Sequence, residues 1–195
     1  MENKRTETPL RRALEEYIDA GWSRLHMPGH KGAPIEPFGP LAAYDLTEVE
    51  GTDSLFEDDG PLKELEEIFT QLYGTRSSVI SAGGSTLCIQ AMLRLVAREG
   101  GKVIAGRNIH AAAVNAMALL GLEPVWVYPQ RYTEERLIGR IAPEDVAAVL
   151  ERESNVGAVY ITSPDFFGVM SVIEGSAEVA LAHGTGTALL LARKD

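Results

Sequence analysis

The sequence predicts an α/β protein in which a mostly parallel β-sheet is covered by helices on both faces. From residue 77 onward, short β-rich runs alternate with helical stretches, the pattern of consecutive strand-helix-strand units. The chain has 195 residues, of which 45% are hydrophobic, so it can bury a core. The expected strands are 77–81, 102–105, 124–128, 157–162 and 188–191, and the expected helices are 85–98, 111–120, 143–153 and 173–182.

Two further helices are predicted in the first part of the chain. Pro9 begins an amphipathic helix that Gly21 ends, and Pro61 begins a second helix with Gly74 at its C-cap position. Between these helices, residues 26–60 contain several prolines and glycines without sustained periodicity, so an irregular segment that wraps over another part of the protein is expected.

Composition and charge exclude several classes of function. The net charge of −10 repels nucleic-acid phosphates and anionic lipid headgroups, so neither a nucleic acid nor a membrane is an expected partner. Cys88 is the only cysteine, which excludes an internal disulfide and a thiolate-rich zinc site. No apolar stretch approaches the roughly 18 residues of a membrane helix. A cytoplasmic location is therefore expected.

A loop before the helix at 85–98 has the composition of an anion site. Gly83 and Gly84 allow the backbone to approach a ligand closely, and Ser85 and Thr86 follow at the helix start. Free N–H groups and the helix dipole favour a phosphate there. The alternative is that the glycines only make the turn and Ser85 only caps the helix. No G-x-G-x-x-G or P-loop pattern is present, which argues against dinucleotides and nucleoside triphosphates.

Two more polar loops follow predicted strands, and the carboxyl ends of parallel strands share one sheet edge. His110 is expected at the start of the helix at 111–120, where it could cap the helix, stack on a flat ligand or shuttle a proton. Residues 162–168, Thr-Ser-Pro-Asp-Phe-Phe-Gly, could line the mouth of a pocket or form an ordinary turn.

Histidines and acids near the N-terminus raise two weaker hypotheses. His26 and His30 are four residues apart, but Pro28 and Gly29 between them argue against a shared helix face, so no metal site is predicted. The acidic run at 48–59 could receive a cationic substrate, although a solvated loop explains the run equally simply.

Taken together and in order, these motifs resemble the ornithine/lysine/arginine decarboxylase family, whose members are pyridoxal-phosphate enzymes of the aspartate-aminotransferase fold, fold type I. The resemblance extends from about residue 24 to about residue 168. It is carried by His-Met-Pro-Gly-His-Lys-Gly at 26–32, Asp-Leu-Thr-Glu-Val-Glu-Gly at 45–51, Gly-Pro at 60–61, Gly-Gly-Ser-Thr at 83–86, Arg-Asn-Ile-His at 107–110 and the segment at 162–168.

The resemblance implies roles for particular residues. Gly84, Ser85 and Thr86 match the loop that holds the cofactor phosphate, His110 matches the histidine that stacks on the pyridine ring, and Ser163 is assigned to the cofactor site. The implied reaction converts lysine, ornithine or arginine to cadaverine, putrescine or agmatine, a step of amino-acid metabolism and polyamine biosynthesis. The segment at 26–32 is implied to lie near a dimer-related active site, so a homodimer or higher homo-oligomer is expected of the full-length parent.

The sequence also departs from the family pattern. The family's Schiff-base lysine lies in a Ser-x-His-Lys motif, and none of the five lysines has that context: Lys4, Lys31, Lys63, Lys102 and Lys194. The family's Asp-x-Ala-His motif has no good counterpart either, since Asp195 is poorly spaced.

These departures predict an N-terminal fragment that is inactive alone. Residues 1–60 would form the N-terminal helix and wrapping segment, and residues 61–195 an incomplete cofactor-binding major domain. The alternatives are a non-catalytic phosphate-ligand or partner-binding remnant of such an enzyme, and another fold type I enzyme.

Overall fold

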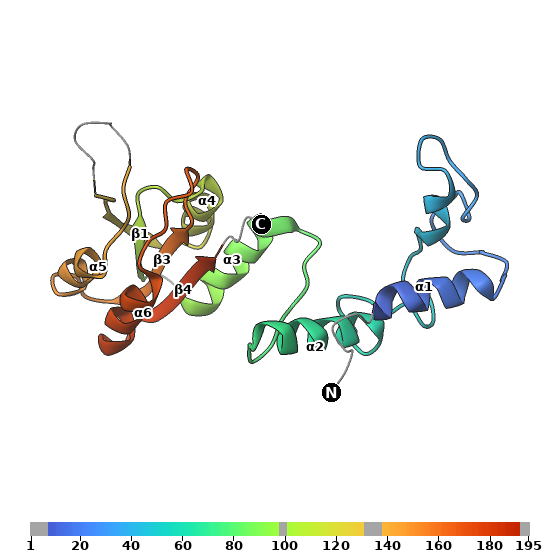
Figure 1. The fold of residues 1–195 in the computed structure, drawn as a ribbon, viewed down its shortest axis with the longest axis horizontal. Coiled ribbons are helices and arrows are strands. Elements are labelled where there is room, and N and C mark those ends of the chain that lie inside the picture. The colour runs from blue at the N-terminus through green and yellow to red at the C-terminus, as the bar shows by residue number, and fades with distance from the viewer. Residues whose placement is uncertain (1–7, 98–100, 131–137, 192–195) are drawn as a thin grey trace. The chain divides into compact units, whose positions relative to one another are not determined.

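The computed structural model describes residues 8–97, 101–130 and 138–191, which form two compact units (Figure 1). The first unit extends to Ala82 and the second begins at Gly83. Sequence analysis placed the boundary at residue 60 instead. The difference arises because the helix that begins at Pro61 packs on the first helix of the chain, so it belongs to the N-terminal unit.

The N-terminal unit contains helix α1 (Pro9–Asp19), the 3-10 helix η2 (Pro40–Tyr44) and helix α2 (Pro61–Tyr73). Both predicted α-helices are confirmed at their expected starts. Gly74 ends α2 in the left-handed conformation, with φ of 63°, and donates its N–H to the carbonyl of Thr70. Apart from η2, residues 26–60 are irregular, as predicted.

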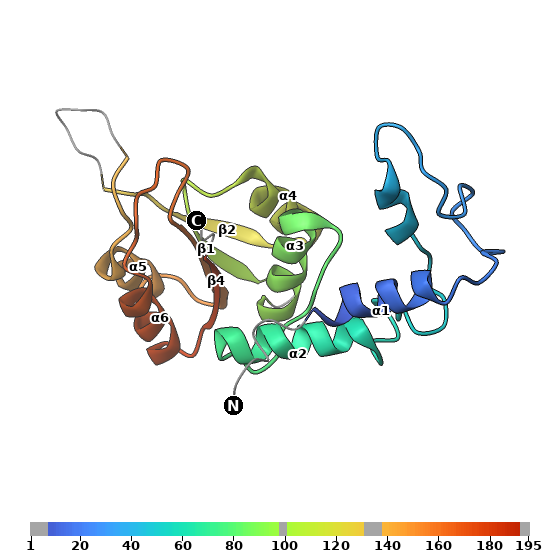
Figure 2. The same cartoon turned by 45° about the vertical axis from the view of Figure 1, so that its right-hand side comes forward.

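The C-terminal unit is built on a four-stranded parallel sheet with the order β2-β1-β3-β4. Helix α3 precedes β1, and one helix connects each strand to the next (Figure 2). The predicted α/β class and parallel sheet are confirmed. The elements in chain order are α3 (Gly84–Val96), β1 (Lys102–Gly106), α4 (Ala111–Leu119), β2 (Glu123–Val127), α5 (Pro143–Leu150), β3 (Val156–Ser163), α6 (Ile173–Ala182) and β4 (Gly186–Leu191).

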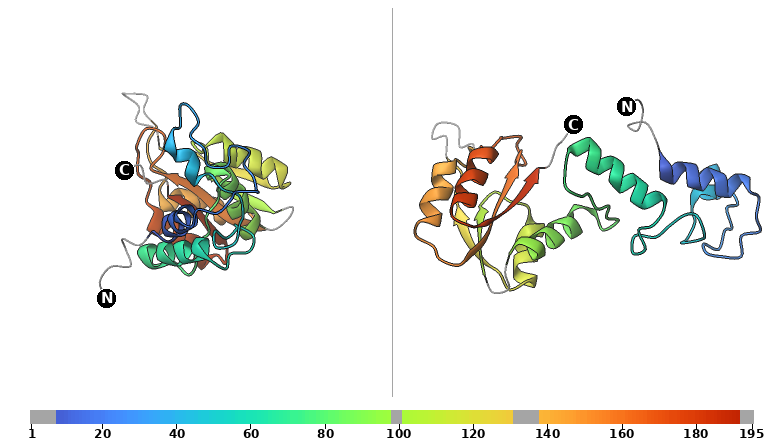
Figure 3. Two further views of the ribbon diagram at one scale, coloured as in Figure 1. Left: turned by 90° about the vertical axis from the view of Figure 1, so that its right-hand side faces the viewer. Right: turned by 90° about the horizontal axis from the view of Figure 1, so that it is seen from below.

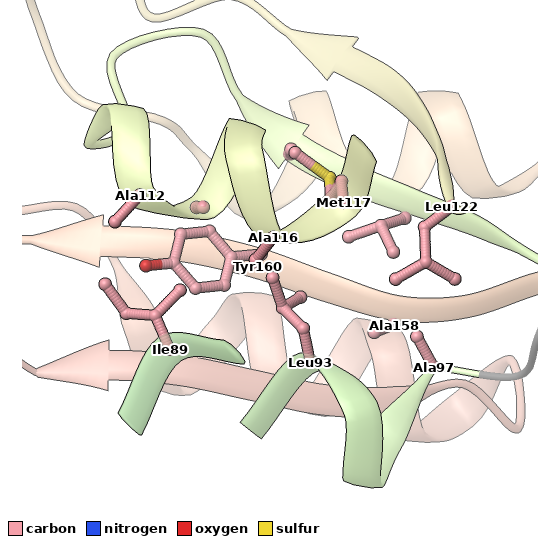
Figure 4. Close-up of a cluster of buried hydrophobic side chains, with 12 residues drawn as sticks. Ile89, Leu93, Ala97, Ala112, Ala116, Met117, Leu122, Ala158 and Tyr160 are labelled. Carbon is pink, nitrogen blue, oxygen red and sulfur yellow. The ribbon is translucent and has the colours of Figure 1, made fainter. Parts of the chain in front are cut away.

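Two hydrophobic clusters cover opposite faces of this sheet, because successive strand residues point to opposite sides. On one face, Ala158 and Tyr160 pack under α3 and α4 (Figure 4). On the other face, Ile104 and Ile161 pack under α5 and α6. Figure 3 shows these helix pairs on either side of the strands. The unit is therefore the predicted three-layer arrangement.

The segment 77–81 is not a strand, contrary to the sequence prediction. A strand needs a neighbouring backbone to pair with, and the four described strands pair only with one another. The N–H of Ile80 is instead donated to a side chain, the carboxylate of Glu66, at 2.7 Å. Among the described residues, none of the helices is both long and apolar enough to cross a membrane.

Candidate functional site

The polar loops of the C-terminal unit meet at the carboxyl edge of the sheet. Figure 4 shows Ile89 of α3 and Ala112 of α4 beside the hydroxyl end of Tyr160, and Ala97 and Leu122 toward the opposite end of the strands. The N-terminal turns of α3 and α4 therefore lie at the edge where parallel α/β sheets bind ligands. Ser85 is one helical turn before Ile89, and His110 is two residues before Ala112.

The start of α3 has the geometry of an anion site. Gly83 is the N-cap residue and has no side chain that could cap the helix, and Ser85 and Thr86 in the first turn are exposed. Ser85 is therefore not the N-cap residue, and the first-turn N–H groups have no partner within the helix itself. Both glycines are required for the turn. A Cβ at position 83 would lie 2.5 Å from Leu87 Cδ2, and Gly84 has a φ of +64°.

His110 is the N-cap residue of α4. Its Nδ1 accepts a hydrogen bond from the N–H of Ala112 at 3.0 Å, so the neutral ring carries its proton on Nε2. The capping interpretation is thus confirmed. Capping occupies one nitrogen of an exposed side chain and fixes the ring plane, which leaves Nε2 and the ring face for a ligand. Stacking on a ligand stays a prediction.

Ser163 and its neighbour Thr162 end β3 on opposite faces of the sheet. Ser163 follows Ile161 on the α5 and α6 side and is fully buried. Its Oγ accepts a hydrogen bond from the N–H of Ser171 at 3.1 Å, which braces the loop after β3. The structure therefore brings Ser85, Thr86 and His110 to one side of the sheet edge and turns the Ser163 side chain away. The role of Ser163 at the cofactor stays a prediction.

A buried carboxylate ties the loops after β1 and β3 together. Asp165 is 8% exposed, and its Oδ1 accepts hydrogen bonds from the N–H groups of Phe167 at 2.9 Å and Val169 at 3.0 Å. Its Oδ2 accepts one from the side-chain amide of Asn108 at 3.1 Å. Sequence analysis missed this contact. The sequence did hold one signal for it, because Asn108 and Asp165 lie in loops that follow adjacent strands.

Two hydroxyls on β3 were also missed. The Tyr160 hydroxyl and Thr162 Oγ1 are buried and have no hydrogen-bond partner among the described residues. An unpartnered buried hydroxyl costs about 1–3 kcal/mol. Burial raises the pKa of the Tyr160 phenol, and the nearby Thr162 hydroxyl offsets part of that rise although the two oxygens do not meet hydrogen-bond geometry. Both residues lie in an apolar run of the sequence. The only signal for them was the alternation of strand side chains, which places residues two apart on the same face of a sheet.

Lysines are absent from this edge within the described part of the C-terminal unit. Lys102 begins β1 at the opposite edge and pairs with Glu153 at 2.8 Å, which raises the Lys102 pKa and lowers the Glu153 pKa. Lys31 and Lys63 belong to the N-terminal unit. Lys4, Lys194 and Asp195 lie outside the described residues.

The two N-terminal histidines are held by contacts within their own unit. The Nδ1 of His26 faces the carbonyl of Met27, so it carries a proton, and its Nε2 lies 2.6 Å from the Tyr17 hydroxyl. His30 accepts the N–H of Gly32 on Nδ1, and its Nε2 lies 3.0 Å from Asp45. Because both nitrogens of each ring are engaged, these side chains fix the fold of residues 26–45.

One member of the acidic run, Asp53, binds backbone N–H groups at the start of a helix, while Glu48, Glu50, Glu57 and Asp59 are exposed. Burial opposes ionisation of Asp53, but hydrogen bonds from the backbone N–H groups of residues 54, 60, 59 and 62 outweigh it and lower its pKa. Two of those groups, in Gly60 and Leu62, begin α2. Asp53, Glu57 and Asp59 each place one carboxylate oxygen within 4.8 Å of the others.

The family model for the Orn/Lys/Arg decarboxylase major domain matches residues 8–174. The chain belongs to this decarboxylase family. It is 29% identical over 167 residues to an uncharacterised protein of Bacillus subtilis, covering 83% of this chain and 35% of that protein. It is 26% identical to the arginine decarboxylase of the same organism over 181 residues, covering 89% of this chain and 37% of the enzyme.

Solved structures show the same fold for family members. The structure of a lysine decarboxylase from Francisella novicida matches with a TM-score of 0.75 at 18% identity, covering 88% of this chain and 27% of that one. The chain thus has the fold of the type I enzymes. It spans little more than a third of the length of the curated relatives above.

Proposed function

We propose that this decarboxylase family member acts on a basic amino acid, namely lysine, ornithine or arginine, with pyridoxal 5'-phosphate as cofactor. The observation that carries the proposal is the carboxyl sheet edge, where the starts of α3 and α4 lie on the same face as two hydroxyls that have no hydrogen-bond partner among the described residues. These groups fit a phosphorylated ring, since they offer N–H donors, hydroxyls and an imidazole. When bound, pyridoxal phosphate supplies an acceptor for the electrons released as carbon dioxide leaves.

The phosphate would be held at the start of α3. The first-turn N–H groups and the positive end of the helix dipole attract a dianion, and the exposed Ser85 and Thr86 hydroxyls add donors. Each hydrogen bond to a charged group contributes about 1.5–3 kcal/mol. His110 would lie against the ring, because its bond to Ala112 sets the plane of the imidazole.

A cationic substrate agrees with the net charge of −10, which raises the local concentration of cations without choosing among the three amino acids. The similarity to an arginine decarboxylase supports arginine as the first substrate to test. We also propose assembly as a homodimer or higher homo-oligomer. Large hydrophobic side chains of the N-terminal unit are exposed, including Leu25 at 92% and Phe56 at 101% of their full area, as expected of a surface that another chain covers.

Binding of the cofactor is tested most directly with pyridoxine 5'-phosphate, which carries the ring and phosphate but lacks the aldehyde that reacts with surface lysines. Equilibrium dialysis should show saturable binding to the 195-residue chain. The double variant Ser85→Ala and Thr86→Ala should bind at least about tenfold more weakly, because it loses two hydroxyl donors. Pyridoxine without the phosphate should bind both chains equally weakly. Unchanged binding by the double variant would contradict the phosphate site.

A second candidate function is binding of a phosphorylated ligand without turnover. It is favoured by the position of Lys102, which is paired with Glu153 at the edge opposite the site. Incubation of the 195-residue chain with pyridoxal phosphate and each basic amino acid should therefore yield neither diamine nor agmatine. Catalytic turnover by this chain alone would show that one of its own lysines serves the reaction.

A further inference from the structure

We propose that the hydroxyls of Tyr160 and Thr162 are part of the ligand site. From strand β3, on the face covered by α3 and α4, they contact an anionic oxygen of the bound phosphorylated pyridine. The inference rests on the proposed cofactor and adds two binding residues to it. Neither residue belongs to the loops that the sequence marked as polar, since both lie within strand β3.

The two hydroxyls lie near the proposed ligand site and are covered by protein atoms in this structure. The Tyr160 ring lies between Ile89 of α3 and Ala112 of α4, and its oxygen points toward the carboxyl edge of the sheet (Figure 4). Ile89 is one turn from Ser85, and Ala112 donates its N–H to His110. Thr162 is two residues further along β3, on the same face and closer to that edge. The hydroxyls therefore lie beneath the groups proposed to hold the phosphate and the ring.

Their lack of partners points to a ligand rather than to a structural role. Tyr160 is fully buried, yet neither its hydroxyl nor Thr162 Oγ1 forms a hydrogen bond within the described residues. A hydroxyl used only for packing gains nothing over phenylalanine or valine of the same shape, and buried polar groups without a partner are rare. Because burial raises the pKa of Tyr160, its phenol stays protonated at neutral pH and can donate to an anionic oxygen.

The proposal predicts opposite effects on stability and affinity. The variants Tyr160→Phe and Thr162→Val remove one oxygen each and keep the shape of the side chain. Without ligand, each should unfold at a denaturant concentration equal to or above that of the wild type. With pyridoxine 5'-phosphate, Tyr160→Phe should bind about tenfold to hundredfold more weakly in equilibrium dialysis, the range for a lost hydrogen bond to a charged group. Tyr73→Phe, which removes an exposed hydroxyl from α2, is the matched control and should change neither quantity.

Two smaller probes identify the oxygen. If Tyr160→Phe weakens the binding of inorganic phosphate, the hydroxyl faces the phosphate; if it weakens only pyridoxine and its phosphate, the hydroxyl faces the ring. Both results support the proposal. Wild-type affinity in both variants, or a loss of affinity that merely follows a loss of stability, would overturn it while the Ser85 and Thr86 variant still supports the phosphate site. Absence of binding of any probe by the wild type would overturn the cofactor proposal and this inference together.

Discussion

The contact between Asn108 and Asp165 should stabilise the C-terminal unit measurably. Replacing Asn108 by alanine removes the 3.1 Å hydrogen bond to a carboxylate that is 8% exposed, a loss of about 1.5–3 kcal/mol. The same substitution removes Asn108 Oδ1, which is buried and has no partner in the described part of the chain, and relieves about 1 kcal/mol. The free energy of unfolding should therefore fall by about 0.5–2 kcal/mol.

The measurement needs a signal from the C-terminal unit alone. The chain has two tryptophans, Trp22 in the N-terminal unit and Trp126 in β2, so a Trp22→Phe background reports on β2 only. Urea unfolding of Asn108→Ala, Asp165→Ala and the double variant, followed by Trp126 fluorescence, then gives the coupling energy of the pair.

The coupling energy of Asn108 and Asp165 in these variants decides whether their hydrogen bond joins the two loops. The double variant should be destabilised by less than the sum of the single variants, by about 1 kcal/mol or more. Asp165→Asn should be milder than Asp165→Ala, because an amide oxygen still accepts the N–H groups of Phe167 and Val169 while Asn108 turns its amide over to accept. Additive single effects would refute the idea that this bond joins the two loops.

Four further substitutions test the packing and the titrations. Gly106→Ala should lower the stability of the C-terminal unit by about 1–3 kcal/mol in the same urea assay, since the added Cβ would lie 2.5 Å from Ile141 Cδ1. Leu93→Ala, in the centre of the α3 and α4 face, should cost about 2–5 kcal/mol. Because the pKa of Asp53 is lowered on folding, its contribution to the N-terminal unit is present above pH about 4 and is lost as the pH falls further. Asp53→Asn should weaken that dependence, followed by Trp22 fluorescence in a Trp126→Phe background. Because the pKa of Tyr160 is raised, the C-terminal unit should lose stability above pH about 10, and Tyr160→Phe should lose less.

Local signals in the sequence were sufficient for the helices and for the parallel sheet. Pro9 and Pro61 begin helices and Gly74 ends one because these residues restrict or extend the backbone within a single turn. The same locality explains why the start of α3 and His110 were found as candidate site residues. In both cases, a loop of polar or small residues leads directly into the start of a helix in the sequence.

Contacts between distant residues account for what the sequence did not predict. Segment 77–81 has the composition of a strand but pairs with none of the described strands, and α2 joins the N-terminal unit through its packing on α1. Asp53 caps a helix that begins several residues later, which no adjacent pattern indicated.

The sequence by itself determined the family, the α/β class and the polar loops at the sheet edge, because motifs and hydrophobic periodicity are properties of neighbouring residues. Only the tertiary structure decided which side chains face the site. The alternation of β3 turns Thr162 toward α3 and α4 and Ser163 toward the opposite face. The packing of two helices leaves the Tyr160 hydroxyl buried, with no partner in residues 8–97, 101–130 and 138–191. Where a side chain points and which groups it contacts depend on elements far away in the chain. Residue type and spacing alone therefore do not specify them.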